Sequence, residues 1–82
     1  MDNRYMVVTY IQKPDGKYDE VTNFRKNLNK NSLSTAKVIL DFKTKTLVKN
    51  GLNPSASFDD MLEFYKRVLG EKLDPYLPSD SP

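Results

Sequence analysis

Two stretches of the chain have the hydrophobic pattern of β-strands. Residues 5–11 are mostly β-branched or aromatic, and apolar side chains occupy both alternating faces, which is typical of a strand that is central in its sheet. Residues 36–43 alternate instead between an apolar and a mostly charged set. The apolar set is Val38, Leu40 and Phe42, and the other set is Lys37, Ile39, Asp41 and Lys43. This second pattern predicts one buried face and one mostly solvated face.

The clearest turn signal joins the first strand to a weaker one. Residues 14–16 read Pro-Asp-Gly: proline presets φ, aspartate binds its own backbone, and glycine accepts a left-handed conformation. Residues 18–25 are therefore expected to return as the second strand of a hairpin. A bulge in this strand would reconcile Val21 with Phe24, which otherwise point to opposite faces.

The segments on either side of the third strand are mostly polar. Residues 27–35 predict a polar connection with a short helical turn, held to the core by Leu28 and Leu33. Residues 44–45 favour a tight reversal, after which residues 46–49 pair back with the third strand. Asn-Gly then follows directly and marks another turn.

Residues 58–69 have the spacing of an amphipathic helix. Ser57 can cap its first turn, and the carboxylate of Asp60 can reach back to complete a capping box. Gly70 is placed to end it. The apolar stripe consists of Phe58, Met61, Leu62, Tyr65 and Leu69, widened by Phe64 and Val68.

These elements predict an α+β fold, in which an antiparallel sheet of three or four strands, built from two hairpins, carries one C-terminal helix packed on one face. The chain has 82 residues, which suits a single domain over residues 1–72. Residues 73–82 would form a proline-rich tail that is partly disordered. Within it, Leu73, Tyr76 and Leu77 are expected to touch the domain or a partner.

The chain contains no histidine and no cysteine. Serine-histidine-aspartate triads, cysteine nucleophiles and metal sites built on these residues are therefore excluded. Asp59 and Asp60 diverge by about 100° on a helix, so they do not converge on one ion, and the helix N-terminus explains both. No glycine-rich phosphate loop can be written. A serine-lysine dyad and acid-base catalysis by Asp, Glu, Lys or Tyr alone stay open by composition, but no spacing supports a dyad. The composition favours a non-catalytic protein with no cofactor and no metal.

The net charge of +2 conceals an uneven distribution. Residues 25–49 contain seven cations and a single acid, whereas acids dominate the C-terminal part. The basic stretch can be a solvated sheet face, or it can be a patch for an anionic partner.

The same composition bears on location. The lack of cysteine suits a reducing compartment, the start of the chain does not have the pattern of a signal peptide, and the longest apolar stretches are too short to span a bilayer. We therefore expect a cytoplasmic protein without membrane contact.

Exposed tyrosines and the basic stretch supply the candidate binding residues. They are Tyr5, Tyr18, Arg25, Lys37, Lys43, Lys45, Lys49 and Tyr76. Tyrosine and arginine are favoured anchors in protein interfaces, and tyrosines flanked by lysines on a sheet can also hold single-stranded nucleic acid. A free sheet edge offers a further route, pairing of two copies into a homodimer.

Three segments together carry a resemblance. They are residues 5–17 (Tyr-Met-Val-Val-Thr-Tyr-Ile-Gln-Lys-Pro-Asp-Gly-Lys), residues 38–43 (Val-Ile-Leu-Asp-Phe-Lys) and residues 47–50 (Leu-Val-Lys-Asn). With the closing helix, they resemble small uncharacterised proteins encoded by tailed phages of marine cyanobacteria, over roughly residues 4 to 70. The resemblance brings no catalytic residues. It implies an accessory protein of the host cytoplasm that binds a host or phage protein, as a modulator or as part of an assembly.

Overall fold

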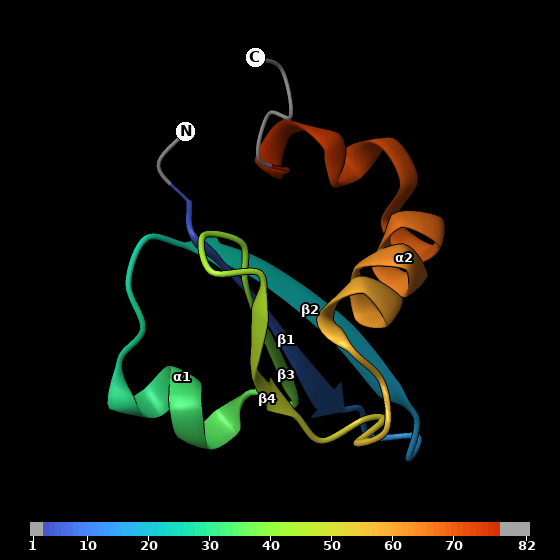
Figure 1. Ribbon diagram of the computed structural model, residues 1–82. Helices are drawn as coiled ribbons and strands as arrows, with labels where there is room; N and C mark the ends of the chain where they lie inside the picture. Colours follow the sequence, from blue (N-terminus) through green and yellow to red (C-terminus); the bar gives the residue numbers. More distant parts are fainter. Residues whose placement is uncertain (1–2, 78–82) are drawn as a thin grey trace.

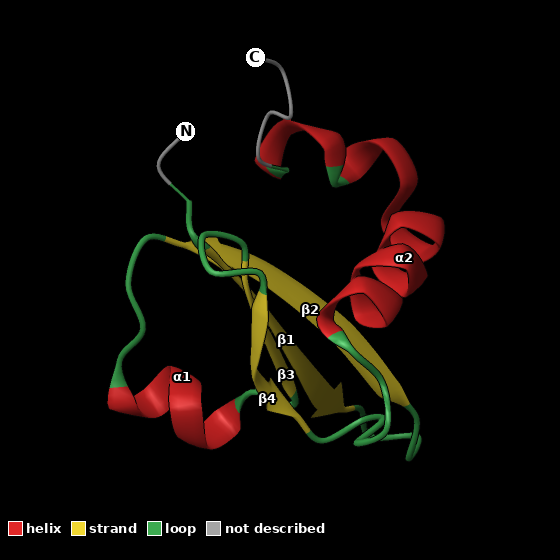
Figure 2. Cartoon of the chain, in the orientation of Figure 1, coloured by secondary structure: helices red, strands yellow, loops and turns green. Residues whose placement is uncertain are grey.

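A four-stranded antiparallel sheet with one helix on each face forms the core of the computed structural model, which describes residues 3–77 (Figures 1 and 2). The strand order is β2-β1-β3-β4. The elements in chain order are β1 (Tyr5–Gln12), β2 (Tyr18–Arg25), α1 (Lys30–Thr35), β3 (Val38–Asp41), β4 (Thr46–Asn50), α2 (Phe58–Leu69) and the 3₁₀ turns η1 (Gly70–Lys72) and η2 (Asp74–Tyr76). The predicted α+β class, with two hairpins and a C-terminal helix, is confirmed.

The β1–β2 hairpin closes through the predicted turn. The amide of Lys13 donates to the carbonyl of Lys17 at 2.7 Å, the Asp15 carboxylate accepts from the Lys17 amide at 2.9 Å, and Gly16 has φ +87°. Pairing then runs residue for residue along both strands, so the predicted bulge near Val21 is wrong. The only register shift recorded for the sheet lies in the β3–β4 pair instead, between Ile39 and Leu40.

The face of the sheet that α2 covers holds the larger core. Met6 and Val8 of β1 and the β3 side chains opposite them are fully buried there, together with Tyr65 of α2. Leu73, just beyond η1, is also fully buried in this cluster, and Leu77 packs against it. The fold therefore continues past residue 72, while residues 78–82 of the predicted tail lie outside the described residues.

The opposite face of the sheet is covered by α1. The helix is capped by Asn29, whose side-chain oxygen accepts from the Ser32 amide at 2.7 Å, and Ala36 follows it into a second buried cluster with Val7 and Ile39.

All of β3 is buried. The predicted solvated face is therefore wrong at Ile39, which packs in the second cluster, and at Asp41, whereas Lys37 and Lys43 on either side of β3 are exposed as predicted.

The two predicted leucine anchors of this segment differ. Leu28 packs against the second cluster as expected. Leu33 is 45% exposed, and Ser32 supplies the buried side chain of α1 instead. The buried side chain of α1 is therefore a small polar residue.

The cap and the stop of α2 are as predicted. The Asp60 amide donates to the Ser57 hydroxyl, and the Asp60 carboxylate accepts from the Ser57 amide, both at 3.1 Å. Gly70 ends the helix with φ +57°, in the left-handed region that favours glycine.

A buried carboxylate ties the start of the chain to the β3–β4 turn. Asp41 is 4% exposed and accepts two bonds from the guanidinium of Arg4, from Nε at 2.9 Å and from Nη2 at 2.7 Å. It also accepts from the amides of Lys43 and Thr44. The Arg4 hydrogen bond is the main cause that lowers the pKa of Asp41 from 3.8 to about 2, and the Thr44 and Lys43 amides add to it against the opposing effect of burial.

We predict that Asp41→Asn removes this pH-dependent stabilisation. The folded-state pKa lies below the unfolded value, so the stabilisation is present above about pH 4 and is lost as the pH falls to about 2. The shift corresponds to about 2 kcal/mol at neutral pH. Urea unfolding at pH 7 and at about pH 2, where most of the stabilisation is lost, measures it.

The control is Glu63→Gln, an exposed carboxylate on α2 that should change the unfolding free energy by less than about 0.5 kcal/mol. Equal stability of wild type and Asp41→Asn at neutral pH would contradict the role given to this carboxylate.

Candidate functional site

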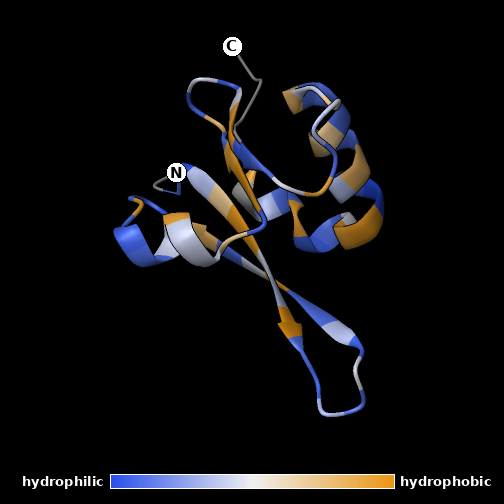
Figure 3. Ribbon diagram, turned by 90° about the horizontal axis from the view of Figure 1, so that it is seen from below, coloured by the Kyte–Doolittle hydropathy of each residue, from blue (hydrophilic) through white to orange (hydrophobic). Residues whose placement is uncertain are grey.

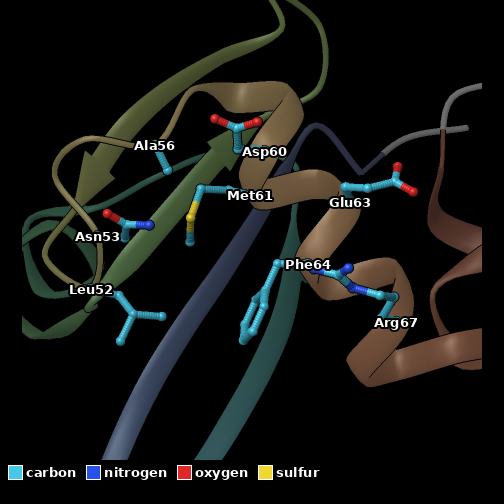
Figure 4. A pocket seen from close by; sticks show the side chains of 8 residues that line it. All are labelled: Leu52, Asn53, Ala56, Asp60, Met61, Glu63, Phe64 and Arg67. Carbon is cyan, nitrogen blue, oxygen red and sulfur yellow. The ribbon is translucent and has the colours of Figure 1, made fainter.

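A groove lies between α2 and the loop that precedes it, and we call it the α2 groove (Figure 4). Its volume is about 530 Å³. The residues that line it are Leu52, Asn53, Ala56, Asp60, Met61, Glu63, Phe64 and Arg67. Leu52 of the loop and Phe64 of the helix point to the same side of the groove and are 42% and 37% exposed.

The loop wall of the groove is held by a network around Asn50. The side-chain oxygen of Asn50 accepts from the amides of Leu52 and Asn53, and its amide nitrogen donates to the Asn53 carbonyl at 2.6 Å. The Gly51 amide donates to the Lys37 carbonyl at 2.8 Å, and a Cβ on Gly51 would lie 3.3 Å from that oxygen. Leu52 is therefore presented by an ordered turn, which lowers the entropic cost of binding through it.

The helix wall places three charged side chains around Leu52 and Phe64, which form the apolar floor of the groove. Asp60 is already engaged in the cap of α2. Glu63 and Arg67 are one turn apart but form no ion pair within the described part of the chain. Both side chains are exposed and can therefore pair with groups on a partner.

A second hollow, which we call the tyrosine hollow, lies beside the β1–β2 hairpin. It is lined by Tyr10, Tyr18 and Lys37 and has a volume of about 490 Å³. β3 pairs with β1 only over Tyr5–Val8, so the rest of the hairpin projects beyond the sheet (Figure 3). Tyr18 is 62% exposed on this projecting part.

The tyrosine hollow also has an acidic neighbour. Glu20 lies directly opposite Tyr10 in the β1–β2 pairing. Burial is the main cause that raises the pKa of Tyr10, and the negative charge of Glu20 raises it further. Lys37 therefore does not give the hollow a strongly positive field.

The predicted binding residues do not form one surface. Tyr18 and Lys37 meet in the tyrosine hollow, and Tyr5 and Arg25 lie opposite each other at the other end of the β1–β2 pair. Tyr5 is half-buried under the guanidinium of Arg4, whose carbon lies 4.9 Å from the ring centre. Arg25 lines a separate hollow of about 180 Å³ between the hairpin and α1.

The remaining predicted residues are also dispersed. Lys43 and Lys45 lie in the β3–β4 turn, where Lys45 has φ +55°. The ammonium of Lys49 donates to the Leu33 carbonyl at 3.0 Å and so joins β4 to α1. Tyr76 belongs to η2, and its side chain lies outside the described part of the structure.

The sequence prediction missed the α2 groove. The helical spacing places Phe64 in the apolar stripe of the helix, and no periodic pattern in the sequence marks Leu52. An apolar residue directly after an Asn-Gly turn is a usable signal, because turns are solvent-exposed. No local pattern, however, places Leu52 beside Phe64.

Two kinds of site are not found among residues 3–77. No helix there is long and apolar enough to cross a bilayer. No cluster of three or more acidic side chains in this part of the chain is arranged to hold a metal ion.

Comparison of the chain with protein-family models, curated proteins and solved structures gave no match. The assignment of function therefore depends on the surfaces described above.

One polar atom under the sheet surface is unsatisfied. The hydroxyl of Tyr65 is buried in the larger core and makes no hydrogen bond of acceptable geometry, although Tyr10 lies near enough to interact with it. Burial raises the pKa of Tyr65 far above its usual value, with a further contribution from Tyr10. The ring of Tyr65 contributes to packing, and its hydroxyl incurs a desolvation cost.

We predict that Tyr65→Phe leaves the unfolding free energy unchanged or raises it by up to about 1 kcal/mol, because it removes a buried hydroxyl that lacks a partner. Thermal and urea unfolding measure the effect. Leu73→Ala in the same cluster is the contrasting variant and should lose about 2–5 kcal/mol. A loss of more than about 1 kcal/mol in Tyr65→Phe would instead mean that the hydroxyl is well bonded.

Proposed function

We propose that this chain is a small non-catalytic, phage-encoded accessory protein of the host cytoplasm, which binds a host or phage protein through the α2 groove. The observation that supports the binding site is the meeting of Leu52 and Phe64, both exposed, on one groove from two different elements. The phage origin rests on the resemblance of the strand and turn segments. Binding would modulate the partner or build an assembly with it.

The groove has the composition of a protein interface. Its apolar floor is flanked by Glu63 and Arg67, and protein interfaces characteristically combine an apolar centre with a polar rim. Both walls are rigid: one is a capped helix and the other is the Asn50 turn. A partner side chain that inserts between Leu52 and Phe64 would bury apolar surface at little cost in ordering the groove.

The distribution of charge also favours a protein partner. Nucleic-acid affinity depends on several cations that neutralise adjacent phosphates. Here Lys49 is engaged with α1, Lys43 and Lys45 lie in a turn, and Arg25 faces a separate hollow. The basic stretch of the sequence is thus divided among several surfaces.

The non-catalytic assignment has its own support. Asp41, the carboxylate whose pKa is lowered to about 2, is buried and bound by Arg4 and two turn amides. It therefore stabilises the fold and is not presented to a substrate.

The tyrosine hollow favours a second candidate function, nucleic-acid binding. Tyr18 offers an exposed ring on which a base can stack, and Lys37 offers a charge for a neighbouring phosphate. Glu20 opposes this function because it faces Tyr10 across the hairpin. A site of this kind would hold single strands weakly and without reading their sequence.

For the protein partner, we predict that Leu52→Asp weakens capture at least about tenfold, because a charge would enter the apolar floor of the groove. The immobilised chain is exposed to a lysate of phage-infected cyanobacteria, retained proteins are identified by mass spectrometry, and affinity is then measured with the purified partner. Leu33→Asp is the matched control, since Leu33 is equally exposed but lies on α1. Equal binding by both variants, or no retained protein, would contradict the proposal.

For nucleic acid, we predict that any affinity for single-stranded oligonucleotides falls steeply with salt and depends on the tyrosine hollow. Tyr18→Ala should lose about 1–3 kcal/mol of binding free energy, and Lys37→Ala should reduce the salt slope by about one. Fluorescence anisotropy measures both, with Lys43→Ala as a control outside the hollow. Absence of binding to DNA and RNA at low salt removes this candidate.

A further inference from the structure

The outer side of β2 carries backbone groups that no strand of the described residues satisfies. The bond from the Lys13 amide to the Lys17 carbonyl sets the phase of the hairpin ladder. Bonded positions alternate along an antiparallel pair, so Asp19, Val21 and Arg25 bond to β1. Tyr18, Glu20 and Thr22 therefore direct their N–H and C=O groups away from β1, toward the open edge of the sheet.

The two edges of the sheet differ in protection. β4 is 5 residues long, lies next to the register shift at Ile39 and Leu40, and is joined to α1 by Lys49. β2 is 8 residues long, contains no proline or glycine, and pairs with β1 without a bulge. Short length, bulges and covering elements are the usual protections of an edge. β2 is neither short nor bulged, and no strand of residues 3–77 pairs with its outer side.

We propose that β2 pairs antiparallel with β2 of a second copy of this chain, around a two-fold axis at Thr22, so that one sheet runs through both copies. This interface lies apart from the α2 groove and does not depend on the proposed function. A second copy fits this edge because the exposed charges of β2 complement each other when the strand pairs with itself.

The backbone phase limits the registers that such a pair can adopt. Outward-facing positions must oppose outward-facing positions, so the axis must pass through a residue and not between two residues. The residues near the middle of β2 are Glu20, Val21, Thr22 and Asn23. An axis at Glu20 places this carboxylate against itself, and axes at Glu20 and Asn23 use only short stretches of β2. The long registers are therefore those centred on Val21 and Thr22.

Charge complementarity distinguishes these two registers. Centring on Thr22 places Asp19 opposite Arg25 of the second copy, and symmetry forms the same pair twice. Centring on Val21 places Asp19 opposite Asn23 and forms no charge pair. Asp19 and Arg25 are both exposed and lie on the same face of the sheet, where opposed side chains of a non-bonded pair come closest.

The test is a charge exchange, measured by analytical ultracentrifugation over a concentration series. Wild type should form a reversible dimer. Asp19→Lys and Arg25→Glu should each raise the dimer dissociation constant by about tenfold, because each places two like-charged pairs in the interface. The double variant Asp19→Lys/Arg25→Glu should return it to near the wild-type value. This rescue is specific to the register centred on Thr22.

Three further variants make the result unambiguous. Lys13→Gln removes the partner of Asp19 within its own chain, 3.4 Å away, and should leave the dimer intact. Thr22→Pro removes an outward amide at the axis and should abolish the dimer while circular dichroism shows a folded chain. Leu52→Asp should also leave the dimer intact, which separates this interface from the α2 groove.

A wild-type chain that stays monomeric at millimolar concentration overturns the proposal and leaves this edge to a strand of another protein. A dimer that ignores the single charge reversals and Thr22→Pro also overturns it, because the interface then lies elsewhere.

Discussion

Burial of the β1–β3 pair on both faces is the constraint on which the rest of the fold depends. Met6 and Val8 face α2, whereas Val7 and Ile39 face the side covered by α1. A small domain can bury only a modest share of its surface, and here the middle of β1 and all of β3 lie within that share. The candidate binding surfaces therefore lie where this shielding ends: at the projecting end of the hairpin, and on the outer side of α2 with the loop before it.

The position of each surface follows from the elements around it. β3 begins at Val38, which pairs with Val8, so the rest of the β1–β2 hairpin projects past β3. Tyr18 and Lys37 lie beside each other in the tyrosine hollow there. The loop between β4 and α2 presents Leu52 in the same groove as Phe64 of α2. β2 remains an edge because β1 is its only neighbour in the described sheet. In each case, packing of the interior determines which side chains are presented outside.

The basic stretch illustrates why charge along a sequence is a poor guide to charge on a surface. Asp41 is its only acid, yet it binds the guanidinium of Arg4 from 37 residues away. Lys49 serves a similar structural purpose by donating to the Leu33 carbonyl. A charge engaged within the chain, buried as at Asp41 or exposed as at Lys49, is less available to a ligand than its place in the sequence suggests.

Local chemistry was sufficient to predict the Pro-Asp-Gly turn, the Ser57 capping box, the Gly70 stop and the two hairpins, because each depends on residues within a few positions of one another. Tertiary structure alone decided that Ile39 is buried, since that depends on α1 lying across the sheet. It also brought Leu52 to Phe64 and the ammonium of Lys49 to the Leu33 carbonyl. These outcomes depend on contacts between distant segments, which a pattern of period two or 3.6 does not encode.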